Sequence, residues 1–133
     1  MNAPSWTLNY LGLPFEECGR ARDGLDCWGL VRLALVEVFK LEGLPDFAGQ
    51  YSRSRDRTVP EIFAQELKRW RQVTEPTAGD IIVLRLSGRP WHVGLMVNRD
   101  VMLTIDRGTC SVLERVDSPR WHGRLDGYYR YER

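Results

Sequence analysis

The sequence predicts an α+β fold in which N-terminal helices pack on a C-terminal antiparallel β-sheet. Residues 28–71 contain two segments whose apolar side chains recur at helical spacing. Residues 81–131 instead contain short β-branched runs separated by turn-forming residues, which is typical of an antiparallel sheet. Because 133 residues suffice for one hydrophobic core and leave little room for a second, we expect a single domain over residues 1–133.

Two helices are expected ahead of the sheet. Trp28–Leu41 is apolar around most of its circumference, so we expect a central, buried helix. A second helix, Pro60–Arg71, starts at a proline and places three large apolar side chains on one face: Phe63, Leu67 and Trp70. The preceding segment, Pro4–Gly24, is rich in turn-forming residues and is expected to be an irregular lead-in.

Five strands are expected after these helices. Each is a short run of β-branched or aromatic residues bounded by turn signals. They are Ile81–Leu86, Trp91–Val97, Val101–Ile105, Ser111–Val116 and a last strand at Gly127–Tyr131.

Composition excludes several classes of protein. The 19 basic and 18 acidic side chains give a formal net charge of +1, without the basic surplus of a dedicated nucleic-acid or membrane-surface protein. The longest apolar stretch, Leu30–Phe39, is interrupted by Arg32 and Glu37, so we expect no membrane insertion. Residues 1–10 lack the features of a signal peptide, and we expect synthesis in the cytoplasm without one.

Cys27 is the candidate nucleophile. Three widely spaced cysteines do not form a disulfide framework, and no histidine lies at zinc-ligand spacing from them. Cys27 stands where a loop enters the first helix, and a helix N-terminus favours the thiolate. The structural alternative is a small buried side chain, which is the usual role of a free cysteine.

His92 is the candidate general base. Strand alternation places His92, Gly94 and Met96 on one face, and Gly94 would leave room there for a helix to approach. The alternative is a structural histidine near a strand end. His122 lies in an expected loop and is expected to be solvated.

A base of this kind needs a polar group that orients its ring. If residues 98–100 form the turn of an even-register hairpin, Thr104 and Asp106 share the face of His92. A slip of one residue would move both side chains to the other face. Thr104 and Asp106 are therefore the two candidates for the third position.

These motifs together resemble the NlpC/P60 cell-wall peptidases, which are papain-like cysteine peptidases. The closing stretch, Trp121–Tyr129, and the tryptophan after the cysteine are most similar to the branch encoded with bacteriophage tail genes. The resemblance runs from about residue 10 to residue 130 and is carried by four segments: Tyr10–Phe15, Gly24–Leu33, Ala78–Leu84 and Trp91–Val97.

The resemblance implies a papain-like fold, with Cys27 as nucleophile and His92 as general base and acid, and it implies no metal or organic cofactor. It places the third catalytic position 12 residues beyond His92, at Thr104, where the family often has a second histidine. Thr104 departs from that pattern, and Asp106 is the expected substitute. Tyr10 and Trp28 are candidates to line a substrate groove, although packing is the commoner role of such aromatic residues.

By the same resemblance, the substrate is the peptide part of peptidoglycan, often at the bond between γ-D-glutamate and a diamino acid. Phage tail proteins are the expected partners, and a virion would carry the enzyme to the wall. Two alternatives remain open. One is a tail-assembly module with the same fold and little or no catalysis. The other is a related amidase or acyltransferase that acts on another amide or on a lipid.

Overall fold

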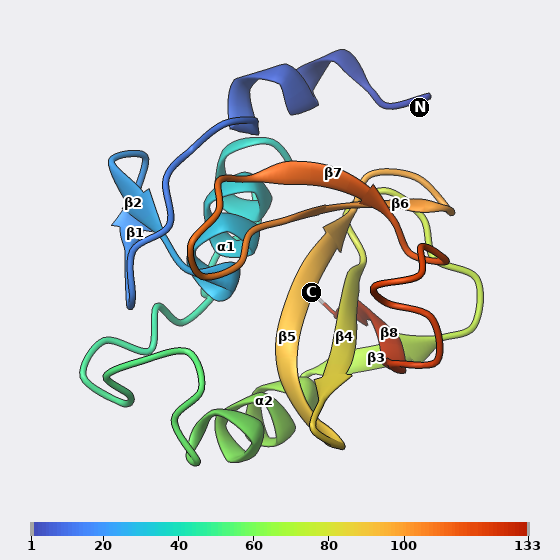
Figure 1. The fold of residues 1–133 in the computed structure, drawn as a ribbon. Helices are drawn as coiled ribbons and strands as arrows, with labels where there is room; N and C mark the ends of the chain where they lie inside the picture. The colour runs from blue at the N-terminus through green and yellow to red at the C-terminus, as the bar shows by residue number, and fades with distance from the viewer. Residues whose placement is uncertain (1, 133) are drawn as a thin grey trace.

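The computed structural model describes residues 2–132. This part of the chain contains a 3-10 helix, η1 (Ser5–Tyr10), and two α-helices, α1 (Cys27–Glu37) and α2 (Val59–Leu67). A short hairpin, β1 (Arg20–Ala21) and β2 (Gly24–Leu25), stands beside the start of α1 (Figure 1). No helix within residues 2–132 has the length and apolar character needed to cross a bilayer.

The main sheet has six strands in the order β3-β8-β4-β5-β6-β7, and every neighbouring pair is antiparallel. The predicted fold class, α+β with helices on an antiparallel sheet, is therefore confirmed. The strands are β3 (Trp70–Val73), β4 (Ile81–Leu86), β5 (Arg89–Met96), β6 (Val101–Thr104), β7 (Val112–Arg115) and β8 (Leu125–Tyr131).

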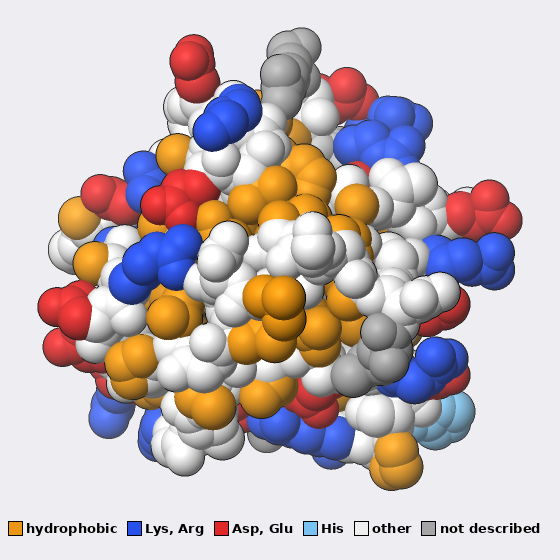
Figure 2. Space-filling view, turned by 90° about the horizontal axis from the view of Figure 1, so that it is seen from above, with side chains coloured by type: hydrophobic (Ala, Val, Ile, Leu, Met, Phe, Trp, Pro, Cys, Tyr) orange, Lys and Arg blue, Asp and Glu red, His pale blue; other side chains and the backbone are white. Residues whose placement is uncertain are grey.

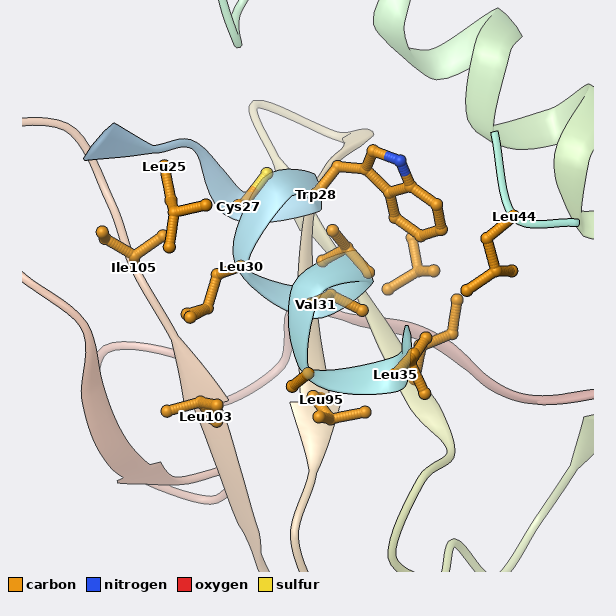
Figure 3. Close-up of a cluster of buried hydrophobic side chains, with 14 of the residues drawn as sticks. Leu25, Cys27, Trp28, Leu30, Val31, Leu35, Leu44, Leu95, Leu103 and Ile105 are labelled. Carbon is orange, nitrogen blue, oxygen red and sulfur yellow. The ribbon is translucent and has the colours of Figure 1, made fainter. Parts of the chain in front are cut away.

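Helix α1 is central and buried, as its apolar circumference predicts. Asp26 caps its first turn by accepting a hydrogen bond from the Gly29 backbone N–H at 2.8 Å. Leu30 and Val31 are completely buried and face the sheet. Figure 3 shows the helix side chains pointing toward Leu95 and Leu103 of the adjacent strands.

The two faces of the sheet carry separate apolar clusters. The cluster on the α1 face includes Val93 and Leu95 of β5. The opposite face carries a smaller cluster of buried side chains: Ile82, Leu84, Met96, Met102 and Trp121. Gly94 belongs to this second face, where a Cβ on it would meet Met102 Sδ at 2.9 Å. The expectation that Gly94 makes room for a helix is therefore wrong, because Met102 and Ile82 occupy that space.

Strands β5 and β6 pair over only two residues, Leu95 with Leu103 and Met96 with Met102. Toward its start, β5 therefore has no ladder partner on the β6 side, and β6 leaves β5 at a steep angle in Figure 1. Helix α1 packs against both strands at this divergence. The first turn of α1 consequently meets the backbone of β5 at its open edge.

Three local predictions require correction. The first helix ends at Glu37 rather than Leu41, because the chain turns through Lys40 in the left-handed region at φ 57°. The second helix ends at Leu67, since Trp70 pairs with Tyr131 in the sheet and is buried there. The segment expected to be irregular contains both η1 and the β1–β2 hairpin.

The end of the molecule that carries η1 and β7 exposes apolar side chains. Leu8 of η1 is 71% exposed, and Val112 of β7 is 37% exposed. Figure 2 views this end from above and shows hydrophobic side chains gathered in the middle, with charged side chains around the rim. Cys27 belongs to a different region, at the opposite end of α1 from the residues that η1 contacts.

We predict that Gly29→Ala destabilises the fold. A Cβ at Gly29 would lie 2.1 Å from the Gly19 carbonyl oxygen, so α1 would have to move away from the β1–β2 hairpin. Overpacking of this kind costs about 1–3 kcal/mol. Urea unfolding measures the loss, with Val36→Ala on the exposed side of the same helix as control. A Gly29→Ala protein as stable as the parent would contradict the close contact.

Candidate active site

Cys27 is the first residue of α1 and is 6% exposed. Its side chain borders a small cavity of about 10 Å³, close to the space that one water molecule needs. The other residues around this cavity come from α1, from the 51–54 segment and from α2: Trp28, Tyr51, Ser54, Val59, Ile62 and Phe63. Access to the thiol therefore requires movement of these surrounding segments.

Asp26 fixes the position of Cys27. Besides capping α1, its carboxylate accepts a hydrogen bond from Arg20 Nη1 at 2.8 Å and another from the Tyr51 hydroxyl. The carboxylate is buried, and its charge is balanced by the Arg20 guanidinium. These contacts tie the first turn of α1 to the β1–β2 hairpin and to the 51–54 segment.

The thiol of Cys27 is neutral in this closed site. Burial raises the pKa of Cys27 to about 12, and the nearby Asp26 carboxylate adds to the increase. The backbone N–H groups of Val93 and Trp28 act in the opposite direction, because they are directed at the sulfur and favour the thiolate. The sequence-based expectation of a lowered pKa is therefore wrong for the resting protein, since desolvation outweighs the helix N-terminus.

His92 lies on β5 and is 2% exposed. Its Nε2 lies 2.6 Å from Thr104 Oγ1 of β6, so the hairpin has the even register expected for it. Burial lowers the pKa of His92 to about 4. The imidazole is therefore neutral at pH 7.

Cys27 lies against the backbone of β5 beside His92 rather than against the imidazole itself. The sulfur faces the backbone of Val93, the residue next to His92 in the chain. Within residues 2–132 no hydrogen bond joins Cys27 to His92.

Among the described residues, 2–132, no hydrogen bond joins Asp106 to the imidazole. One carboxylate oxygen accepts a hydrogen bond from Arg120 Nη2 at 2.5 Å, and the other lies 3.6 Å from Arg55 Nη2. The suggestion that Asp106 orients His92 in place of Thr104 is therefore wrong at the level of contacts. Its charge still raises the pKa of His92, although burial has the larger effect.

Trp121 covers the imidazole, a contact that the sequence did not predict. The Trp121 and His92 rings stack with centroids 4.8 Å apart and an interplanar angle of 18°. Arg120 lies over the Trp121 ring at 4.5 Å. Within residues 2–132, two buried polar atoms of this segment, Trp121 Nε1 and Ser118 Oγ, lack a hydrogen-bond partner. Because residues 117–124 have no strand or helix periodicity, no sequence signal placed Trp121 here.

The two proposed groove residues differ in position. Tyr10 donates a hydrogen bond to Glu37, ten residues along α1 from Cys27, which is about 15 Å at the rise of a helix. The suggestion that Tyr10 lines a groove beside Cys27 is therefore wrong. Trp28 does border the Cys27 cavity, but it is 2% exposed and donates to the Pro45 carbonyl at 2.9 Å. It can meet a substrate only after the surrounding segments move.

The residues that the structure describes hold no group of three His, Cys, Asp or Glu side chains arranged to bind a metal. The reactive groups that the site itself supplies are the Cys27 thiol, the His92 imidazole and the Thr104 hydroxyl.

Comparison with known proteins gives the family. The family model described as the NlpC/P60 family matches residues 12–130, which is most of the chain. The chain belongs to the NlpC/P60 family. No sequence among curated proteins matches it significantly.

Solved structures of NlpC/P60 proteins share the fold. The chain superposes on an NLP/P60 family protein from Staphylococcus aureus subsp. aureus Mu50, similar to a lipoprotein, with a TM-score of 0.67 and 19% identity. Superposition on a family protein from Bacillus cereus ATCC 10987 gives a TM-score of 0.66 at 20% sequence identity. Superposition on the NlpC/P60 domain of the peptidoglycan hydrolase SagA gives a TM-score of 0.60 at 21% identity.

These matches cover 96%, 98% and 92% of this chain, respectively. In the other direction, this chain spans 39% of the S. aureus protein and 41% of the B. cereus protein, but 91% of the SagA domain. The predicted papain-like fold is thereby confirmed.

We predict that folding stability falls as the pH drops from 6.5 toward 4. The unfolded chain protonates His92 near pH 6.5, whereas the folded protein binds that proton only near pH 4, so acid favours unfolding across this interval. The contribution of His92 is roughly 3 kcal/mol, at about 1.4 kcal/mol per pH unit. Urea unfolding at several pH values measures it.

His92→Asn should flatten this acid dependence. His122→Asn, which removes an exposed histidine, serves as the matched control and should leave the dependence in place. An unchanged slope in the His92→Asn protein would assign the acid sensitivity to other groups.

We also predict the order in which the thiols react. Cys110 is exposed, whereas Cys27 is buried with a raised pKa. Iodoacetamide at pH 7.5 should therefore modify Cys110 first, and modification of Cys27 should accelerate as the pH rises. Mass spectrometry of peptides identifies each site. A Cys27 thiol that titrates below about 8.5, the value of a free cysteine, would refute the neutral resting state.

Proposed function

We propose that this protein is a cysteine peptidase that hydrolyses amide bonds in the stem peptides of peptidoglycan. The observation that carries the proposal is the meeting of Cys27, at the start of α1, with the β5 edge beside His92, in a chain of the NlpC/P60 family. The name of SagA as a peptidoglycan hydrolase supports the substrate class.

In this proposal Thr104 defines which nitrogen of His92 acts as the base. In the tautomer that carries its proton on Nε2, Nε2–H donates to Thr104 Oγ1, and Nδ1 is then unprotonated and able to take a proton. A neutral hydroxyl orients the ring but offers no charge to stabilise the imidazolium. We therefore expect slower turnover than in an enzyme with a charged or imidazole group at this position.

The reaction is acyl transfer. The Cys27 thiol gives its proton to His92, and the sulfur attacks the carbonyl carbon of the scissile amide. The Cys27 backbone N–H at the start of α1 is the candidate donor to the resulting oxyanion. The imidazolium then protonates the leaving amine, and a thioester to Cys27 remains. Water, deprotonated by His92, hydrolyses this thioester and returns the thiol.

Both reacting groups are neutral at rest, so the ion pair must form after the site opens. Burial raises the pKa of Cys27 and lowers that of His92, and both effects decrease as solvent or substrate dipoles enter. The cavity beside Cys27 has room for about one water molecule, so substrate entry itself requires the 51–54 segment or α2 to move.

The proposed bond is that between γ-D-glutamate and the diamino acid of the stem peptide, and the proposed setting is a phage or prophage tail. The closing stretch, Trp121–Tyr129, supports this branch by its resemblance to tail-encoded members of the family. Tail proteins would then be the partners that deliver the enzyme to the cell wall.

Two observations favour a second candidate, a tail-assembly module with weak or absent catalysis. The third position is an uncharged threonine, and the thiol is strongly desolvated. In this case Cys27 and His92 would serve as packing residues between α1 and the sheet.

A muropeptide assay tests the proposed function. We expect the purified protein to release the diamino-acid-containing fragment from a γ-D-glutamyl tripeptide, detected by liquid chromatography and mass spectrometry. Cys27→Ala should abolish release because it removes the nucleophile, whereas Cys110→Ser should retain it because that exposed thiol lies outside the site. Undiminished release by the Cys27→Ala protein would exclude the mechanism. No release by the parent protein would favour the assembly module.

A further inference from the structure

A carboxylate already lies between two arginines beside the candidate active site. Asp106 follows β6 directly after Ile105, and its carboxylate is held by Arg120 at 2.5 Å and faced by Arg55 at 3.6 Å. The arginines come from different parts of the chain, the segment before α2 and the segment before β8. Together they form a two-sided site with the geometry to accept a carboxylate group.

Arg120 makes three contacts in this site. Its Nη1 is 3.3 Å from Glu114, its Nη2 binds Asp106, and its guanidinium lies over the Trp121 ring. Trp121 in turn stacks on His92. A ligand bound to Arg120 therefore has a fixed position relative to the imidazole.

Arg55, by contrast, has unused N–H hydrogen-bond donors. A guanidinium carries five N–H donors, and within residues 2–132 Arg55 makes no hydrogen bond. Its distance of 3.6 Å from Asp106 is too long for one, and its side chain is 39% exposed. Such a cation can bind an incoming anion without first breaking a strong contact.

Both arginines lie close to the reacting groups. Their charges lower the pKa of His92, which places them within electrostatic reach of the imidazole. Ser54, the residue before Arg55, lines the cavity beside Cys27. Arg55 therefore adjoins the segment that lines the cavity beside Cys27.

We propose that Arg55 and Arg120 bind a free carboxylate that neighbours the scissile amide of the substrate, and that Asp106 faces them until the substrate arrives. This inference rests on the proposed function and narrows it to acidic peptides. In a γ-D-glutamyl peptide the α-carboxylate is free and lies three carbons from the scissile carbonyl. Amidation of that carboxylate removes the charge that the arginines recognise.

Binding measurements separate this inference from turnover. The Cys27→Ala protein is titrated with L-Ala-γ-D-Glu-L-Lys and with the same tripeptide carrying a carboxamide in place of the glutamate α-carboxylate. We expect the carboxylate form to bind about tenfold more tightly or better, as charge-assisted hydrogen bonds permit. Arg55→Gln in the same background should bring the two dissociation constants to within about twofold of each other.

Arg57→Gln is the matched control, because it removes the same charge from the same segment at a residue outside the site. It should leave the preference intact. Equal binding of the two peptides, binding of neither, or a preference that survives Arg55→Gln would each overturn the inference.

Hydrolysis of the two tripeptides by the parent protein is measured separately. Selective binding without hydrolysis would refute the proposed function and keep the carboxylate site. Hydrolysis of both peptides at equal rates, with equal binding, would refute the carboxylate site and keep the proposed function.

Discussion

The structure around the thiol depends on the buried carboxylate of Asp26. It caps α1, accepts from Arg20 and Tyr51, and so joins the hairpin, the helix and the 51–54 segment at one point. Removing one partner of a buried ion pair typically costs about 3–5 kcal/mol, because the other charge stays uncompensated. The same carboxylate raises the pKa of the neighbouring Cys27. The group that positions the Cys27 thiol thus also opposes its ionisation.

Chain-local patterns were sufficient to predict five of the six strands of the main sheet, the buried helix and the adjacency of Thr104 to His92, since strand alternation and a short hairpin fix the register. The protonation of Cys27 could not be predicted in this way. Its helix position favours the thiolate, but desolvation depends on α2 and on the 51–54 segment, whose packing is set by the tertiary fold. The same applies to Arg55, which reaches Asp106 from a segment without periodicity.

The position of the helix ends illustrates the same limit. Trp70 continues the apolar face of the second predicted helix, yet it lies in β3 because pairing with Tyr131 and burial against the core outweigh local helical spacing. Tyr10 likewise lies near the family motif in sequence but contacts the far end of α1 through Glu37. Proximity along the chain therefore did not identify the residues that surround the thiol.

Two buried polar atoms of residues 117–124 lack hydrogen-bond partners among the described residues, and they influence how easily water reaches His92. Within the part of the chain that the structure describes, Trp121 Nε1 and Ser118 Oγ are buried without hydrogen-bond partners, and each such group costs about 1–3 kcal/mol relative to hydration. Local unfolding of this segment would return both groups to water, which offsets part of the free energy needed to separate the Trp121 ring from the imidazole. The segment that covers the imidazole is therefore expected to unfold locally and transiently. Hydrogen exchange would register this motion as weak protection of these amides beside the well-protected strand β5.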